Sequence, residues 1–115
     1  KDIREVQLAK GAIAAGISLM LQQAGRKAEE IQQVLVAGAF GNFIDKASAM
    51  EIGLLPDLPM ERVESIGNAA GNGAGMVLLS KAERQLALEI PEITRHLELA
   101  TCDNFQEEYL KAMSF

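Results

Sequence analysis

A short apolar run, Val34-Leu35-Val36-Ala37, ends abruptly in the small-residue stretch Gly38-Ala39-Phe40-Gly41-Asn42. β-Branched residues favour strands, and apolar residues at every position indicate a strand that is covered on both faces. Glycine lets the chain turn sharply and lets its backbone approach a ligand. The stretch therefore predicts a buried strand over Val34–Ala37 that delivers a turn, Gly38–Asn42, at its carboxyl end.

A second stretch repeats this pattern further along the chain. Val63–Ile66 is a short strand candidate, and Gly67 and Asn68 follow it directly. Asn68 is a good N-cap, because its side chain can accept a hydrogen bond from the first helical turn. We therefore expect a single helix from Asn68 toward Leu88.

That helix would contain three glycines, Gly71, Gly73 and Gly75. Each glycine inside a helix costs about 1 kcal/mol relative to alanine. We therefore expect something to approach this helix closely, either another backbone or a ligand.

A long helix is predicted at the start of the chain. Asp2, followed by Glu5, resembles a capping box, and Gly25 is a suitable C-cap after Ala24. Apolar residues recur along this helix at helical spacing: Ile3, Val6, Ile13, Ile17 and Met20. Small residues that would let another element come close form a stripe beside them: Ala9, Gly11, Ala12, Ala15 and Gly16.

Shorter elements are predicted in the remainder of the chain. Asp45 is a candidate N-cap for a helix over Lys46–Ile52. Pro91 is expected to break the element that precedes it. An edge strand or an extended segment follows at His96–Ala100, and then a terminal helix over Phe105–Met113. One face of that helix is apolar: Phe105, Tyr109, Leu110 and Met113.

The alternation of helices and strands predicts an α/β fold in which helices pack on a short sheet. A length of 115 residues allows one domain with a modest core, so we assign residues 1–115 to a single domain. The sequence opens at Lys1 inside a helix-start pattern and without an initiator Met. We therefore expect it to be a fragment of a longer protein.

Composition disfavours several classes of function. The formal net charge of −5, without a basic stripe, gives little support for binding nucleic acid. The single Cys102 cannot form an intrachain disulfide or a cysteine-only zinc or iron–sulfur site. No signal peptide is evident, and no apolar run reaches the roughly 20 residues of a membrane span. We therefore expect a cytoplasmic protein with neither a nucleic-acid nor a membrane partner.

The candidate motifs each allow more than one interpretation. The Gly38–Gly41 turn can face a nucleotide or be a tight strand-to-helix turn, and its spacing alone favours the tight turn. The Gly67–Gly75 segment can present a helix N-terminus to an anion or permit close packing. Asp45 could position a metal, although capping is the favoured role. His96 lies beside Glu98 without a second histidine, so no metal site and no catalytic set are predicted.

Four motifs nevertheless occur in a characteristic order. They are Asp2–Ile13, Val36–Asp45, Ile52–Pro56 and Ile66–Ala74. Together they resemble the carboxyl-terminal part of the reductive activators of corrinoid proteins. These are ferredoxin-containing ATPases whose large domain belongs to the acetate kinase, sugar kinase, heat-shock chaperone and actin superfamily. The resemblance implies part of an actin-like, ribonuclease H-like ATPase lobe, with residues 1–115 as the C-terminal fragment of a larger ATPase domain.

The resemblance also implies roles for particular residues. Val34–Asn42 lies where the superfamily carries its adenosine motif, so this turn would border the adenine and ribose. The Lys10–Gly16 and Gly67–Gly75 helices resemble the close-packed connecting segments at the hinge between lobes. The implied cofactor-binding residues are Gly38, Ala39, Phe40, Gly41, Asn42, Gly67 and Asn68.

The implied chemistry belongs to the whole protein. ATP, with Mg, would drive electron transfer from an iron–sulfur cluster in an amino-terminal ferredoxin domain. The electron would reduce a Co(II) corrinoid to Co(I) on the corrinoid protein of a methyltransferase system. The cluster ligands and the phosphate-binding hairpins are not among these residues, so we expect no turnover from this chain alone. We also expect a homodimer.

Two other functions are considered. An activator of a radical dehydratase, or a kinase of the same superfamily, usually carries Gly-Gly where Gly38-Ala39 stands, which disfavours both. A non-enzymatic dimerisation or partner-docking domain would suit the Ala/Gly-rich helices and the apolar residues Phe105, Tyr109 and Met113.

Overall fold

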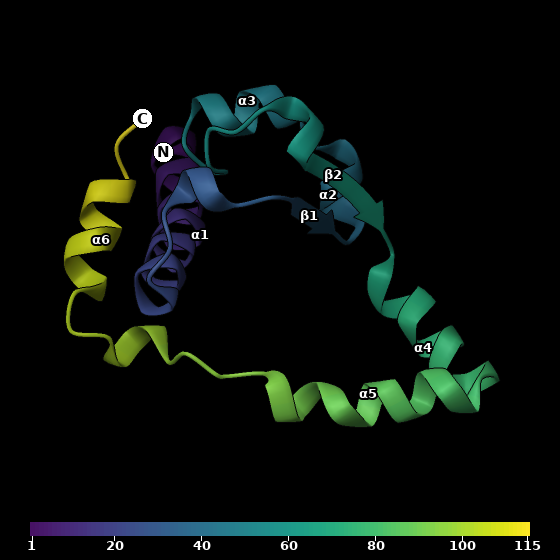
Figure 1. Cartoon of the computed structure of the whole chain (residues 1–115). Coiled ribbons are helices and arrows are strands. Elements are labelled where there is room, and N and C mark those ends of the chain that lie inside the picture. The colour runs from purple at the N-terminus through teal and green to yellow at the C-terminus, as the bar shows by residue number, and fades with distance from the viewer.

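A computed structural model describes all residues from 1 to 115 and shows a long helix, α1 (Asp2–Ala24), with α6 (Phe105–Ala112) beside it (Figure 1). Gly25 ends α1 in the left-handed conformation, with φ 67°, which confirms the predicted C-cap. The predicted N-cap is wrong by one residue. Lys1 occupies that position without a side-chain bond, and Asp2 lies in the first turn, where its negative charge favours the helix dipole.

Helix α6 packs against the stripe of small residues on α1. A Cβ on Gly11 would lie 2.9 Å from Cγ of Met113 and 3.2 Å from Cε1 of Tyr109. The Tyr109 hydroxyl donates to the carbonyl of Leu8 across 3.2 Å. Leu110 points away and is 68% exposed, so it does not share the apolar face predicted for this helix.

Two parallel strands, β1 (Val34–Ala37) and β2 (Val63–Gly67), form the sheet. Both were predicted, β2 one residue shorter. Val34 pairs with Val63 and Ala37 with Gly67, with an irregularity between Val36 and Ala37. The expected burial of β1 on both faces is wrong within this chain, because Leu35 is 54% exposed and nothing here covers the outer face of the sheet.

The connection between the strands is helical. The stretch Gly38–Asn42, predicted as a turn, forms the short helix α2 (Ala39–Phe43) with Gly38 as its N-cap. Helix α3 (Lys46–Glu51) follows, and its predicted cap is confirmed, because the Asp45 carboxylate accepts from Ser48 Oγ at 2.7 Å. Two 3₁₀ turns complete this region: Ala28–Glu30 before β1 and Met60–Arg62 before β2.

The single helix expected after Asn68 is two helices, α4 (Ala69–Leu79) and α5 (Lys81–Ile93). The break falls at Ser80, whose backbone is extended and whose hydroxyl accepts from the amide of Glu83 at 3.3 Å. The Ser80 side chain therefore stabilises the start of α5 at the point where α4 would otherwise have continued. The expected break at Pro91 is wrong, because α5 continues through this residue and ends two residues later, at Ile93.

The segment that joins α5 to α6 contains no strand. The edge strand expected at His96–Ala100 is wrong, since the two-stranded sheet does not extend to it, and a 3₁₀ turn (Leu99–Thr101) forms instead. Cδ1 of Leu99 lies 3.4 Å from where a Cβ on Gly16 would stand, so this turn packs against α1.

The core of the chain is small and lies under α1, α3 and β2. Its buried apolar side chains are Ala15, Leu19, Ala49, Leu54, Leu58 and Val63. No helix is both long enough and apolar enough to cross a membrane.

Candidate functional site

The predicted cofactor-binding residues converge at the carboxyl edge of the sheet. Each parallel strand runs directly into a helix there: β1 into α2 through Gly38, and β2 into α4 through Gly67 and Asn68 (Figure 1). Because the strands are parallel and adjacent, both strand-to-helix junctions meet at one edge. This is where open α/β sheets place their ligands.

The two junctions are joined by a backbone hydrogen bond. The amide of Gly38 donates to the carbonyl oxygen of Gly67 across 2.7 Å. Both glycines have positive φ, 92° for Gly38 and 65° for Gly67, a backbone conformation that residues with side chains rarely adopt. Both have open space where a side chain would stand. The tight strand-to-helix turn predicted as one interpretation of Gly38 is therefore observed. Gly67 makes a similar junction before α4, and neither glycine covers the backbone with a side chain.

Asn68 begins α4 as predicted. Its Oδ1 accepts from the amide of Gly71 at 2.9 Å. A Cβ on Gly71 would collide with the side-chain amide of Asn68, so this glycine makes room for the cap of its own helix. The hinge role implied for Gly71 therefore has a local alternative that involves no second lobe.

Gly41 holds α2 against the sheet. A Cβ there would lie 2.8 Å from Cγ1 of Val36 and 3.0 Å from its carbonyl oxygen. The Ser65 hydroxyl, on β2, donates to the carbonyl of Gly41 across 2.8 Å. The sequence analysis did not identify Ser65, whose only local signal was a hydroxyl group within a short strand.

Phe40 points into a different part of the molecule. Its ring is 68% exposed and lines an apolar cavity of about 330 Å³ between α1, α2 and α3. Lys10 and Asp45 are the charged residues in the lining of that cavity. Ala39 and Asn42 are exposed on α2, while Gly41 is buried. The predicted residues thus divide into the edge pair Gly38 and Gly67, the packing residue Gly41, and the exposed residues of α2.

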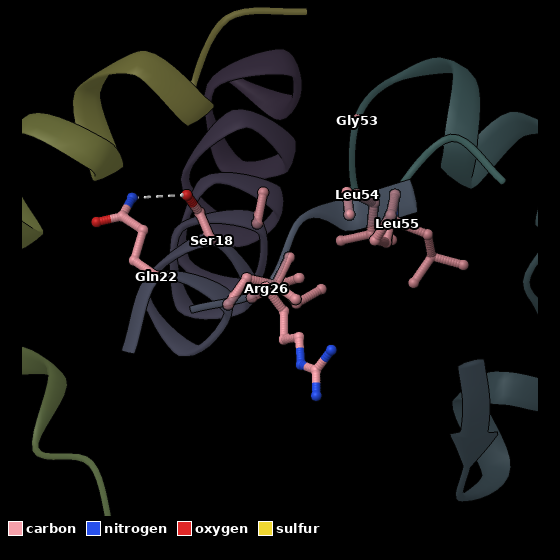
Figure 2. Close-up of a pocket in the computed structure, with 11 residues that line it drawn as sticks. Ser18, Gln22, Arg26, Gly53, Leu54 and Leu55 are labelled. Carbon is pink, nitrogen blue, oxygen red and sulfur yellow. Dashed lines mark hydrogen bonds between the residues drawn. The ribbon is translucent and has the colours of Figure 1, made fainter. Parts of the chain in front are cut away.

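A second cavity, also of about 330 Å³, lies between α1 and the loop after α3 (Figure 2). Its polar groups already have partners. Ser18 accepts from Gln22 at 3.3 Å and donates to Glu108 at 3.1 Å, and Arg26 pairs with Glu30 at 3.0 Å. These bonds hold α1 to its neighbours and leave no group arranged for chemistry.

The carboxyl edge of the sheet presents exposed backbone and open space, and it presents no reactive side chain. None of the predicted site residues carries a charge, and no cluster of His, Cys, Asp or Glu in the chain could hold a metal ion. The residues fit the neutral adenosine part of a nucleotide, since glycine and alanine leave room for a flat group. They do not fit an iron–sulfur cluster, because Cys102 is the only thiol.

The paired strand-to-helix junctions and their helical cover are consistent with part of an actin-like lobe. Residues 1–115 match the family described as the C-terminal domain of RACo, the ASKHA domain, and the chain belongs to this family. ASKHA denotes the acetate and sugar kinase, heat-shock chaperone and actin superfamily.

Individual relatives support the same family assignment. The chain is 48% identical over its full length to the corrinoid activation enzyme RamQ of Eubacterium limosum. It is 30% identical to the [Co(II) methylated amine-specific corrinoid protein] reductase of Methanosarcina barkeri, again over its full length. A solved structure, a reductive activator for corrinoid,iron-sulfur protein, superposes with a TM-score of 0.90 at 34% identity over 99% of the chain. The chain spans only 19% and 22% of the two curated relatives and 18% of the solved chain.

Proposed function

We propose that this chain is the C-terminal part of the ATPase domain of a reductive activator of a corrinoid protein. The observation that carries the proposal is the whole-chain likeness, at 34% identity and a TM-score of 0.90, to a solved reductive activator. The intact protein, of which these residues would form about a fifth, uses ATP to drive reduction of a Co(II) corrinoid to Co(I). Its partner is the corrinoid protein of a methyltransferase system.

Within that protein, the carboxyl edge of the sheet borders the adenosine of ATP. The support is geometric: Gly38 and Gly67 lie next to each other, joined by a hydrogen bond, and neither presents a side chain. Ala39, Asn42 and Asn68 extend this surface along α2 and the start of α4. Gly41 holds α2 against the sheet beneath that surface, and the Phe40 ring lines the cavity between α1, α2 and α3.

The remaining parts of the machinery come from residues outside this chain. No carboxylate is among the edge residues, so Mg and the phosphates are held elsewhere. The iron–sulfur cluster that supplies the electron also lies elsewhere, because a single cysteine, Cys102, cannot hold a cluster. This chain contributes the surface that borders the adenosine part of ATP. The proposal includes a homodimer, which light scattering of the intact protein tests.

The test uses the intact protein that contains this sequence, purified without oxygen. Mixed with its Co(II) corrinoid partner, a reductant and MgATP, it is expected to produce the visible spectrum of Co(I). Omitting ATP, or replacing it with a non-hydrolysable analogue, is expected to abolish the change. A colourless protein of about the size of this chain, with no ATP-dependent cobalt reduction, would overturn the proposal.

The docking-domain alternative loses one of its two supports, the apolar residues near the C-terminus. Its apolar candidates, Tyr109 and Met113, are engaged with Gly11 of α1. Phe105 packs edge-on against Tyr109, with ring centroids 5.6 Å apart. These side chains close the α1–α6 contact and are not free for a partner.

A further inference from the structure

The chain exposes far more surface than a self-contained protein of its size. Its accessible surface is 8605 Å², whereas a compact monomer of 12.4 kDa exposes about 6,100 Å². Its radius of gyration is 16.2 Å, against about 13 Å for a compact chain of this length. A surplus of roughly 2,500 Å² on this side alone is well above the roughly 800 Å² that each partner buries in an interface of standard size.

Much of this surplus lies on α4 and α5. These two helices run apart from the α1–α6 pair and from the sheet (Figure 1). Helix α4 contains no charged residue and no buried one. A helix that is apolar all round is normally buried. Apolar side chains at least half exposed continue along both helices: Met76, Leu78, Leu79, Leu86, Leu88, Ile90 and Ile93.

The glycines of α4 point in the same direction. Nothing lies within 4 Å of where a Cβ would stand on Gly73 or Gly75. Gly71 is explained by its own cap, but these two are not, although glycine weakens a helix. Any segment that approaches these two glycines closely would therefore have to lie outside these 115 residues.

We propose that the apolar surface of α4 and α5 is covered by the part of the same polypeptide that precedes Lys1, seated on α4 at Gly73 and Gly75. This inference rests on the proposed function only for the existence of that preceding part. The relatives are about five times as long as this chain, and the matching family is a C-terminal domain, so most of their length comes before it. The sheet supports the same occupant, because a two-stranded sheet is marginal by itself and α4 leaves directly from β2.

The test compares two leucine substitutions in the intact protein. In the chain as it stands, Gly73→Leu meets open space and removes a helix-weakening glycine, so an uncovered α4 would be unaffected or stabilised. If α4 is covered, the same change forces apart two closely packed segments. We expect Gly73→Leu to lower the thermal midpoint by several degrees. Arg4→Leu also places a leucine at an exposed helical position of α1, outside the Lys10–Gly16 segment, and as the control it is expected to leave the midpoint unchanged.

Hydrogen exchange of the unsubstituted intact protein provides a measurement that does not depend on the variant folding. We expect the amides of residues 69–93 to exchange as slowly as those of α1, at every protein concentration tested. Rapid exchange of these amides, or an unchanged midpoint for Gly73→Leu, overturns the proposal. Protection that appears only as protein concentration rises would identify a second copy as the cover and would equally overturn it. Neither readout involves ATP or cobalt, so failure here is distinct from failure of the proposed activity.

Discussion

The amide of Gly38 and the carbonyl oxygen of Gly67 are 2.7 Å apart, and this bond fastens the first strand-to-helix junction to the second. Each glycine has a backbone conformation that side chains disfavour. A change at either residue therefore alters the position of both junctions, and with them the surface proposed to border adenosine.

The first prediction concerns nucleotide affinity. Gly67→Ala in the intact protein is expected to strain the backbone by about 1–2 kcal/mol and to weaken ATP binding roughly tenfold. Gly25→Ala is a closely matched control. Its φ of 67° is nearly that of Gly67, at 65°, and both sites have open space around them, but Gly25 ends α1. Titration calorimetry with ATP measures both variants, and equal affinities would remove Gly67 from the site.

Local signals predicted the elements whose ends are set by their own residues. Gly25, Asp45 and Asn68 terminate or begin helices as expected, because each acts through a bond or a φ angle within a few residues. The two strands were found for a similar reason, since β-branched runs that end in glycine are local patterns.

The features that depend on distant residues were not predictable in this way. The helical form of Gly38–Asn42 depends on Gly41 lying against Val36 and on a bond from Ser65 of the other strand. The register of β1 and β2 is likewise a long-range property. The edge strand expected at His96–Ala100 failed because a strand needs a partner, which no sequence window contains.

The second prediction concerns the contact between α2 and the sheet. Gly41→Ala is expected to destabilise the α2–sheet contact by about 1–3 kcal/mol, because its Cβ would stand 3.0 Å from the carbonyl oxygen of Val36. Hydrogen exchange of the β1 and β2 amides in the intact protein measures the change. Asn42→Ala, at the next and exposed position, is the control and should leave those amides unchanged.

A companion variant separates the two contacts of that methyl group. Val36→Ala removes the Cγ1 atom 2.8 Å from the Gly41 Cβ position but leaves the carbonyl oxygen in place. The Val36→Ala background should therefore relieve only part of the Gly41→Ala penalty. Complete relief would show that the side-chain contact, and not the backbone contact, excludes a larger residue.

The third prediction concerns the α1–α6 contact. Gly11→Leu places a branched side chain where Met113 and Tyr109 already stand, and it should destabilise α6 by about 1–3 kcal/mol. Faster exchange of the α6 amides in the intact protein is the expected sign. Ala12→Leu introduces the same side chain one residue later, at an exposed position, and should not change α6 exchange. Similar behaviour of the two variants would show that α6 does not depend on the close approach at Gly11.

The fourth prediction concerns a buried cation. The Lys10 side chain is 4% exposed, and its ammonium donates to the carbonyl of Ser114 and lies 5.4 Å from the ring centroid of Phe115. No carboxylate forms a salt bridge with it. A buried charge without a counter-ion contributes little net stability, because the cost of removing it from water offsets what its contacts provide. The hydrocarbon stem of Lys10, in contrast, fills space beside the apolar cavity.

Two substitutions distinguish the stem from the charge. Lys10→Met keeps a side chain of similar length, so the free energy of opening α1, measured by hydrogen exchange in the intact protein, should stay within about 1 kcal/mol of the original. Lys10→Ala removes most of the stem and should cost about 2 kcal/mol or more. If Lys10→Met were as damaging as Lys10→Ala, the ammonium and its contacts with Ser114 and Phe115 would be what holds the tail against α1.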